Sequence, residues 1–460
     1  MNDKQEVRDL LQEAGQRSIA YRESVADRSV APSAKARAAV KRLVETLPEH
    51  GCSAIETLAL LDEIGSPASM AMAGPRFFGF VIGGALPVTL ATNWLSTAWD
   101  QNVVMHEVTP ATATLEQVAM DWLVELLGLP SGTGGGFVTG TTVANFSALA
   151  AARHRVFADV GWDVESRGLI GAPEVTLVVS DEAHPTLFKS LGMLGLGRDR
   201  VIRIPTDSQG RMRVAELPDI NGPTIVCTQA GNINTGAFDP FAEICAAVKP
   251  SGAWVHVDGA FGLWAAASAH YRGLTAGMQM ADSWATDAHK GLNVPYDSGI
   301  AFVRDAADLA AAMAITADYL ITATEFRNPA DYTPELSRRG RGTDIWAAIR
   351  TLGRRGVAEL VDGCCRHAES FAAGLQDAGF DVLNEVVYNQ VLVSFGDDAT
   401  TRSIIQAIQE EGTCWCGATA WHGRTAMRIS ISNWATTAAD VQKSLRAMIA
   451  IARRLVTTSA

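Results

Sequence analysis

The chain has 460 residues, of which 48% are hydrophobic and 19% are charged. This composition excludes extended disorder, and the length predicts two or three structural units. A formal net charge of −12 argues against nucleic acid or an anionic membrane surface as a partner.

Residues 1–75 are expected to form a helical segment. From Ser33 to Leu47, Ala, Val and Leu recur at helical spacing between charged residues, which predicts a helix ended by the proline that follows. A loop rich in glycine, phenylalanine and proline is expected over residues 65–87. Residues 111–127 carry apolar side chains along one helical face and predict an amphipathic helix.

Between residues 130 and 303, short β-branched runs alternate with helical stretches. This alternation predicts an α/β fold with a mostly parallel, buried sheet. The predicted strands are Val175–Val179, Val201–Ile204, Thr224–Thr228 and Trp254–Asp258.

The last third of the chain predicts a smaller α+β unit. An alanine-rich helix after Arg304 is followed by a polar loop near 320–343 and a long helix from about Thr343. Further strands are expected at Gln390–Phe395 and Ala426–Ile431, and further helices at 400–411 and 437–455. We therefore expect a helical N-terminal segment (1–75), a large domain (76–325), a mobile loop and linker (326–345) and a small C-terminal domain (346–460).

Seven cysteines, an odd number scattered over a long chain, indicate a reducing cytoplasm rather than a disulfide framework. Cys414 and Cys416 are the one tight pair, and without a second pair nearby they favour strand packing over a metal site. No metal is expected. The first residues lack the apolar region of a secretory signal, so no such signal is expected. Asp305 and Asp308 interrupt the alanine-rich stretch near 305–316, so it does not predict a membrane-spanning helix.

An acid and a lysine stand at the ends of two successive motifs. Asp258 ends an apolar run, and Lys290 follows it by 32 residues in an Asp-Ala-His-Lys turn. A carboxylate can keep a pyridine nitrogen protonated while an amine forms a Schiff base with an aldehyde, so the pair favours a pyridoxal phosphate (PLP) site. Each residue alone would more simply be a strand-end acid or a surface lysine.

Two further motifs suit such a site. The glycine- and threonine-rich run 134–142 opens a helix, where free N–H groups and the helix dipole favour a phosphate. Threonine also caps helices that bind no ligand. His184 follows a predicted strand directly, at the edge of an α/β sheet where ligands bind, and could stack on a flat ring; an ordinary loop histidine is the simpler alternative.

The chain resembles the PLP-dependent group II decarboxylases, which act on glutamate, aromatic amino acids, histidine and diaminobutyrate. The resemblance runs from Gly74 to Asn433 and follows the family's order of motifs. Its blocks are Gly140–Asn145, Asp181–His184, Gly236–Pro240, His256–Gly262, and Asp282-Ser283 with His289-Lys290. It implies the fold of the aspartate aminotransferase superfamily (fold type I), with a seven-stranded sheet in a large PLP-binding domain.

The resemblance also implies roles for individual residues. Lys290 matches the Schiff-base lysine, Asp258 the partner of the pyridine nitrogen, and His184 the imidazole stacked on the ring. The remaining cofactor-binding residues that it implies are Thr141, Thr142, Asn232, Ala260, Asp287 and His289. Asn232 departs from the family, because relatives often carry threonine there.

Relatives carry a loop tyrosine, often supplied by the partner subunit, that returns a proton after CO₂ leaves. Tyr332, in a polar segment punctuated by proline, is the candidate here, and Tyr319 competes with it. Arg428 resembles an arginine near the family's site and would suit a carboxylate, although a solvent-facing strand arginine is the plainer interpretation. Phe77 is a candidate substrate contact, although such aromatics are more often core residues.

The function that the resemblance implies is decarboxylation of an L-amino acid to an amine and CO₂ by a homodimer with active sites at its interface. Gly83 and Gly84 stand where aromatic amino acid decarboxylases supply a hydroxyl, which leaves the reaction open. The alternatives are an aminotransferase, a decarboxylation-coupled oxidase that forms an aldehyde, or a non-catalytic PLP-binding protein.

Overall fold

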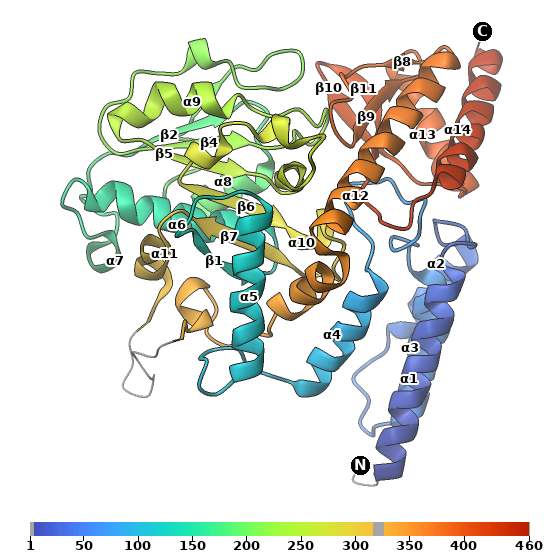
Figure 1. Cartoon of the computed structure of the whole chain (residues 1–460). Helices are drawn as coiled ribbons and strands as arrows, with labels where there is room; N and C mark the ends of the chain where they lie inside the picture. The colour runs from blue at the N-terminus through green and yellow to red at the C-terminus, as the bar shows by residue number, and fades with distance from the viewer. Residues whose placement is uncertain (1–3, 316–325, 460) are drawn as a thin grey trace.

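The computed structural model describes residues 4–315 and 326–459. A large α/β domain carries the sheet, a smaller domain packs beside it, and helices near the N-terminus extend away from both (Figure 1). These helices are α1 (Lys4–Ser24), α2 (Ala34–Ala39) and α3 (Ala54–Ala68). The helix expected from Ser33 to Leu47 is shorter than predicted, because a 3₁₀ turn, Val40–Leu43, replaces its second half and none of its residues is buried.

The large domain is built on a seven-stranded sheet with the order β1-β7-β6-β5-β4-β2-β3. Strands β6, β5, β4, β2 and β3 pair in parallel, and β7 runs antiparallel to both β1 and β6. The expected mostly parallel sheet is therefore confirmed. The strands are β1 (Gly134–Val138), β2 (Thr176–Ser180), β3 (Ile202–Ile204), β4 (Thr224–Gln229), β5 (Trp254–Asp258), β6 (Ser283–Asp287) and β7 (Gly299–Val303).

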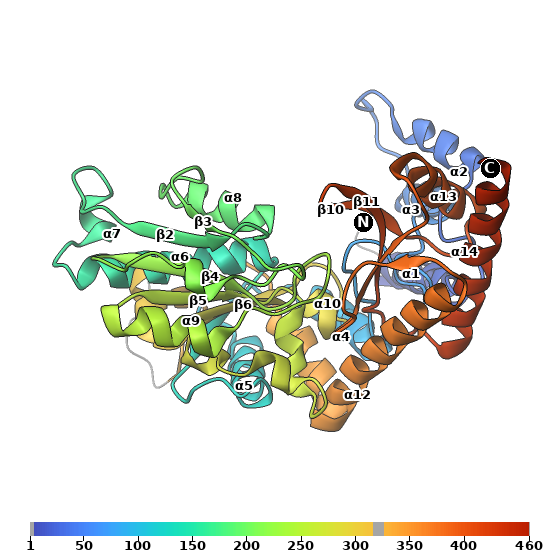
Figure 2. The same ribbon diagram turned by 90° about the horizontal axis from the view of Figure 1, so that it is seen from above.

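Helices cover both faces of the sheet (Figure 2). Alternate strand residues point to opposite faces, and β4 shows this division, because Ile225 and Cys227 pack with α6 and α8 while Val226 packs with α5 and α9. The helices of this domain are α4 (Pro87–Trp99), α5 (Pro110–Leu126), α6 (Thr141–Ala158), α7 (Val164–Arg167), α8 (Pro185–Met193), α9 (Phe241–Val248), α10 (Ala288–Gly291) and α11 (Ala306–Met313). The predicted helix at 111–127 is α5.

The small domain contains a four-stranded antiparallel sheet with the order β10-β11-β9-β8. The long helix α12 enters it from the large domain and bends at Gly353, whose φ of 61° lies in the left-handed region. Its elements are α12 (Gly342–Asp377), β8 (Asp381–Val382), β9 (Gln390–Ser394), α13 (Asp398–Glu411), β10 (Gly417–Trp421), β11 (Arg424–Ser430) and α14 (Ala438–Ser459).

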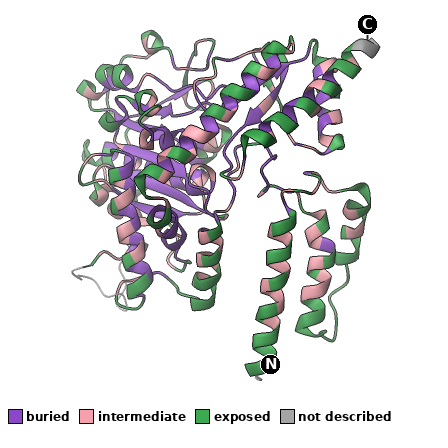
Figure 3. Cartoon of the chain, turned by 45° about the vertical axis from the view of Figure 1, so that its right-hand side comes forward, coloured by how far each residue is buried: buried purple, intermediate pink, exposed green. Residues whose placement is uncertain are grey.

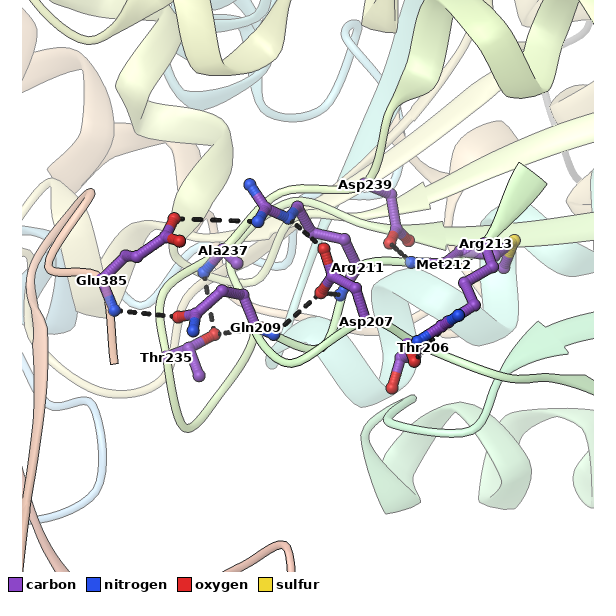
Figure 4. Close-up of polar contacts among 10 residues, drawn as sticks. All are labelled: Thr206, Asp207, Gln209, Arg211, Met212, Arg213, Thr235, Ala237, Asp239 and Glu385. Atoms are coloured by element: carbon purple, nitrogen blue, oxygen red, sulfur yellow. Dashed lines mark hydrogen bonds and ion pairs between the residues drawn. The ribbon is translucent and has the colours of Figure 1, made fainter. Parts of the chain in front are cut away.

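A turn of the large domain connects the two domains through polar contacts (Figure 4). The side-chain oxygen of Gln209 accepts the backbone N–H of Glu385 at 2.9 Å, and the hydroxyl of Thr235 donates to the Gln209 carbonyl at 2.6 Å. Arg211 lies 3.7 Å from the Glu385 carboxylate. These bonds tie the small domain to the loop that follows β4.

Candidate active site

A cavity lies at the carboxyl ends of β4, β5 and β6, beside the turn between β1 and α6. This is the edge at which open α/β sheets bind ligands. Asp258 and Lys290, paired by the sequence analysis, both line it. The cavity is lined by Gly140, Thr141, Thr142, His184, Thr186, Gln229, Gly231, Ile233, Asp258, Ala260, Phe261, Asp287, His289 and Lys290.

The N-terminus of α6 offers a place for an anion. Thr141 is buried, and its hydroxyl oxygen has no hydrogen-bond partner among the described residues. A Cβ added to Gly140 would lie 3.4 Å from both Asp287 and His289, so the absence of a side chain keeps this corner open. An unsatisfied hydroxyl at the positive end of an 18-residue helix fits a phosphate group.

Asp287 connects the lysine to this helix. One of its carboxylate oxygens accepts the backbone N–H of Thr141 at 2.6 Å, and the other lies 2.9 Å from the Lys290 ammonium. Asp287 ends β6 and Lys290 lies in the short helix α10 that follows, so the strand end fixes both groups. The amine is therefore held against the anion-binding corner of the cavity.

His289 lies beside the same corner. Its Nδ1 accepts the backbone N–H of Ser298 at 3.1 Å, which leaves the proton of the neutral ring on Nε2, 3.6 Å from Asp287. The ring stacks on Tyr296 at a centroid distance of 4.2 Å. Burial lowers the pKa of His289, so the ring is neutral and offers one N–H toward the corner.

Asp258 lies at the end of β5 and is buried. Its two carboxylate oxygens accept the side-chain N–H of Asn145 at 2.9 Å and the backbone N–H of Ala260 at 3.2 Å. Burial raises the pKa of Asp258, and the Asn145 hydrogen bond and the charge of Lys290 oppose that rise. A carboxylate placed in this way can pair with a cationic heterocycle.

His184 caps the N-terminus of α8. Its Nδ1 lies 2.7 Å from the Thr186 hydroxyl and accepts the Thr186 backbone N–H at 3.4 Å. Both groups donate, so the proton of the neutral imidazole is on Nε2. Burial lowers the pKa of His184. The ring is therefore a neutral, oriented wall of the cavity.

Asn232 does not line the cavity. Its side-chain oxygen accepts the backbone N–H groups of Asn234 and Thr235, at 2.8 and 3.1 Å, and so shapes the loop after β4. Gly231 and Ile233, its neighbours in sequence, line the cavity instead. Asp239 holds the base of this loop by accepting the Gln229 backbone N–H at 2.7 Å.

Neither Phe77 nor Tyr332 lines the cavity of its own chain. Phe77 is buried and stacks on Trp415 at 5.2 Å. Tyr332 lies in a 3₁₀ turn, packs beside α11, and lies under the Arg327 guanidinium at 3.7 Å. Tyr319 lies outside the described residues.

Arg428 belongs to β11 of the small domain. Within the described chain its guanidinium has no hydrogen bond or ion pair, and burial lowers its pKa to about 10. Its charge acts on His184, so the two side chains face the same region. A half-buried guanidinium without a protein partner, close enough to act on His184, suits a carboxylate ligand.

Several lining residues were not predicted from the sequence, among them Thr186, Gln229 and Phe261. Asn145 belongs to the motif Gly140–Asn145, but no role was predicted for it. Asn145 lies four residues after Thr141 on α6, and this spacing places both on one helical face. That spacing is the signal that points to Asn145.

A lysine, a buried acid and a phosphate-sized corner at one sheet edge define a PLP-dependent enzyme of the α/β class. The comparisons agree. The model of the "Pyridoxal-dependent decarboxylase conserved domain" matches residues 66–396. The chain therefore belongs to the pyridoxal-dependent decarboxylase family, and its cofactor is pyridoxal 5′-phosphate.

The individual relatives are amino acid decarboxylases. The chain is 29% identical over 438 residues to L-2,4-diaminobutyrate decarboxylase of Rhizobium meliloti, covering 90% of this chain and 85% of that protein. It is also 29% identical over 331 residues to acidic amino acid decarboxylase GADL1 of Bos taurus, covering 69% of this chain and 63% of the relative. The fold matches the crystal structure of Oryza sativa TDC with PLP and tryptamine at a TM-score of 0.91 and 22% identity, over 98% of this chain and 99% of that one.

Residues 4–315 and 326–459 contain no helix long and apolar enough to cross a membrane. In the same ranges, no group of three or more His, Cys, Asp or Glu side chains is placed to hold a metal ion.

Proposed function

We propose that the chain decarboxylates an L-amino acid to the corresponding amine and CO₂. The observation that carries this proposal is the cavity itself, which brings the Lys290 amine, the buried Asp258 carboxylate and the Thr141 corner together. The family supports the reaction class, because its curated relatives are amino acid decarboxylases.

Each end of the cofactor has a matching group in the cavity. Thr141, Thr142 and the N–H of His289 would hold the phosphate, and Asp258 would pair with the pyridine nitrogen. Lys290 would bond the aldehyde carbon. When bound, PLP withdraws electrons from the bond to the departing carboxylate. Ala260, whose side chain is a single methyl, leaves room for the flat ring.

The protein's own contribution is to orient the substrate. Arg428 is proposed to bind a carboxylate of the amino acid, because its half-buried guanidinium acts on His184 and has no hydrogen bond or ion pair in the described chain. His184 is proposed to stack on the cofactor ring and fix its tilt, because Thr186 sets its orientation. Holding the carboxylate perpendicular to the ring selects the bond that breaks.

A tyrosine from the segment after Lys290 is proposed to return the proton to the α-carbon. Tyr332 would have to serve the cavity of a partner subunit, because in its own chain it packs beside α11 under Arg327. Tyr319 is the other candidate.

We also propose that the chain acts as a homodimer. Helix α1 contains no buried residue, and the N-terminal helices expose large apolar side chains. Leu11 on α1 is 66% exposed, and Leu61 on α3 is 59% exposed. Figure 3 shows these helices largely exposed beside a well-buried body. Apolar surface of this kind is stabilised by a partner, here a second copy. A cytoplasmic location is proposed from the cysteines, all of which are free.

The reaction is tested with a panel of carboxyl-labelled L-amino acids and the PLP-loaded enzyme. We expect labelled CO₂ and an equal amount of amine from at least one substrate. A keto acid that requires an amino acceptor would instead indicate an aminotransferase. An aldehyde formed with consumption of O₂ would indicate a decarboxylation-coupled oxidase.

A further inference from the structure

The Asp258 carboxylate is the end of a chain of four buried hydrogen bonds. The Nε1 of Trp254 lies 2.8 Å from the Ser283 hydroxyl, which lies 2.8 Å from Nδ1 of His256. The Nε2 of His256 lies 2.9 Å from the side-chain oxygen of Asn145, whose amide nitrogen lies 2.9 Å from Asp258. All five side chains are buried.

The direction of every bond is fixed by its two ends. An indole N–H can only donate, so Trp254 donates to Ser283, and an ionised carboxylate can only accept, so Asn145 donates to Asp258. The Asn145 oxygen must then accept from His256 Nε2–H, and His256 Nδ1 must accept from the Ser283 hydroxyl. All four bonds therefore point the same way and end on the carboxylate.

The sequence builds this chain from three elements. Trp254, His256 and Asp258 are alternate residues of β5 and share one face of the sheet. Ser283 of β6 lies opposite His256 in the strand register. Helix α6 covers this face and supplies Asn145.

The chain requires His256 to be neutral, because a protonated imidazole would donate from both nitrogens. Burial meets this requirement by lowering the pKa of His256 to about 3. Aligned hydrogen bonds in a medium of low dielectric constant polarise one another, so each strengthens the next. The last of them opposes the effect of burial on Asp258.

We propose that Asn145, His256 and Ser283 are positioning residues that keep the Asp258 carboxylate ionised for the pyridine nitrogen of PLP. The inference rests on PLP binding in this cavity. The charge of Lys290, which also lowers the pKa of Asp258, is expected to be lost when the amine bonds the cofactor. The hydrogen-bonded residues Asn145, His256 and Ser283 are neutral, so they are expected to stabilise the ionised form of Asp258 after PLP has bound as well as before.

The test compares Asn145→Ala, His256→Leu and His256→Gln with the wild type. Two quantities are measured: the dissociation constant of PLP, and the ¹⁵N NMR shift of bound PLP labelled at its pyridine nitrogen. Asn145→Ala is expected to weaken PLP binding by about tenfold to a hundredfold, the loss of one hydrogen bond to a charged group, and His256→Leu, which removes the hydrogen bond to Asn145, should weaken it in the same direction. They should also move the shift from pyridinium toward neutral pyridine.

His256→Gln should restore much of both properties, since a glutamine amide can still donate to Asn145. The matched control is Ser147→Ala, because Ser147 is fully buried on the same helix and its hydroxyl has no partner among the described residues. It should leave both quantities at the wild-type values. If His256→Leu or Asn145→Ala does not fold, Ser283→Ala removes a smaller group from the same chain and is expected to change the shift in the same direction.

Wild-type binding and shift in Asn145→Ala, or in Ser283→Ala if only that variant folds, would overturn the inference. Equal losses in His256→Gln and His256→Leu would also overturn it, because they would indicate a packing effect. Failure of the wild type itself to bind PLP would instead contradict the proposed function, so the two failures are distinguishable.

Discussion

Lys290 and Asp287 form an ion pair at the edge of the cavity, with Nζ and Oδ2 2.9 Å apart. The same carboxylate accepts the first N–H of α6 through its other oxygen. One acid thus sets the position of the proposed cofactor-bonding amine relative to the proposed phosphate site. The position of the Lys290 amine therefore depends on Asp287 at the end of β6.

Two roles of Lys290 can be tested separately, its positive charge beside Asp287 and its nucleophilic amine. Lys290→Arg keeps a cation beside Asp287 but removes the amine, so it should fold with nearly wild-type stability and lack the colour of covalently bound PLP. Lys290→Ala also loses the colour, and it should unfold more easily by about 1–3 kcal/mol because a buried acceptor loses its partner. Absorbance spectra and urea unfolding check both. A coloured Lys290→Arg protein would contradict the assignment.

The two tyrosine candidates make different predictions. The Tyr332 ring is engaged by Arg327 and apolar neighbours, so Tyr332→Phe is expected to preserve the ratio of amine to carbonyl products. Tyr319→Phe is expected to lower that ratio, because an unprotonated carbon is open to other reactions. Product analysis by mass spectrometry checks both variants. The opposite pattern would assign the proton donor to Tyr332 and require that it reach the partner's cavity.

A charge placed on the exposed N-terminal helices should separate the proposed dimer. Leu11 lies on α1, which has no buried residue, so Leu11→Glu cannot disturb the core of its own chain. It is expected to halve the mass measured by light scattering. The matched control is Ile170→Glu, since Ile170 is 95% exposed in a loop of the large domain. Equal masses for the wild type and Leu11→Glu would exclude α1 from the interface.

His256 should make the fold less stable in acid. Its pKa is lowered to about 3 from 6.5, so between these values the unfolded chain binds a proton that the folded chain does not. Stability is therefore lost as the pH falls through this window. His256→Gln removes the titrating group, and its unfolding free energy should fall less steeply than that of the wild type, by about 1.4 kcal/mol per pH unit. Parallel curves from urea unfolding between pH 6 and pH 4 would contradict the prediction.

The sequence predicted the elements whose patterns are local. Strand β5 has the predicted bounds, Trp254–Asp258, because a β-branched run ends there in an acid. Strands β1, β6 and β7 of the large sheet were not predicted, and for β1 the structure gives the physical reason. Gly134–Val138 has the glycine content of a turn, yet it is a fully buried strand, and a Cβ at Gly135 would meet the carbonyl oxygen of Ala301 on β7 at 2.0 Å.

The site residues that belong to local sequence motifs were predictable. Lys290, Asp258 and His184 do share one cavity, because parallel strands bring their carboxyl ends to one edge. The bonds among Asn145, His256 and Ser283 were not predictable, since they cross between two strands and a helix and depend on the register of β5 against β6.

Borohydride reduction of the PLP-loaded protein, followed by peptide mapping, tests the central claim most directly. We expect a reduced phosphopyridoxyl group on the peptide that carries Lys290 and on no other lysine. Modification of a different lysine, or none at all in a protein that has bound PLP, would contradict it.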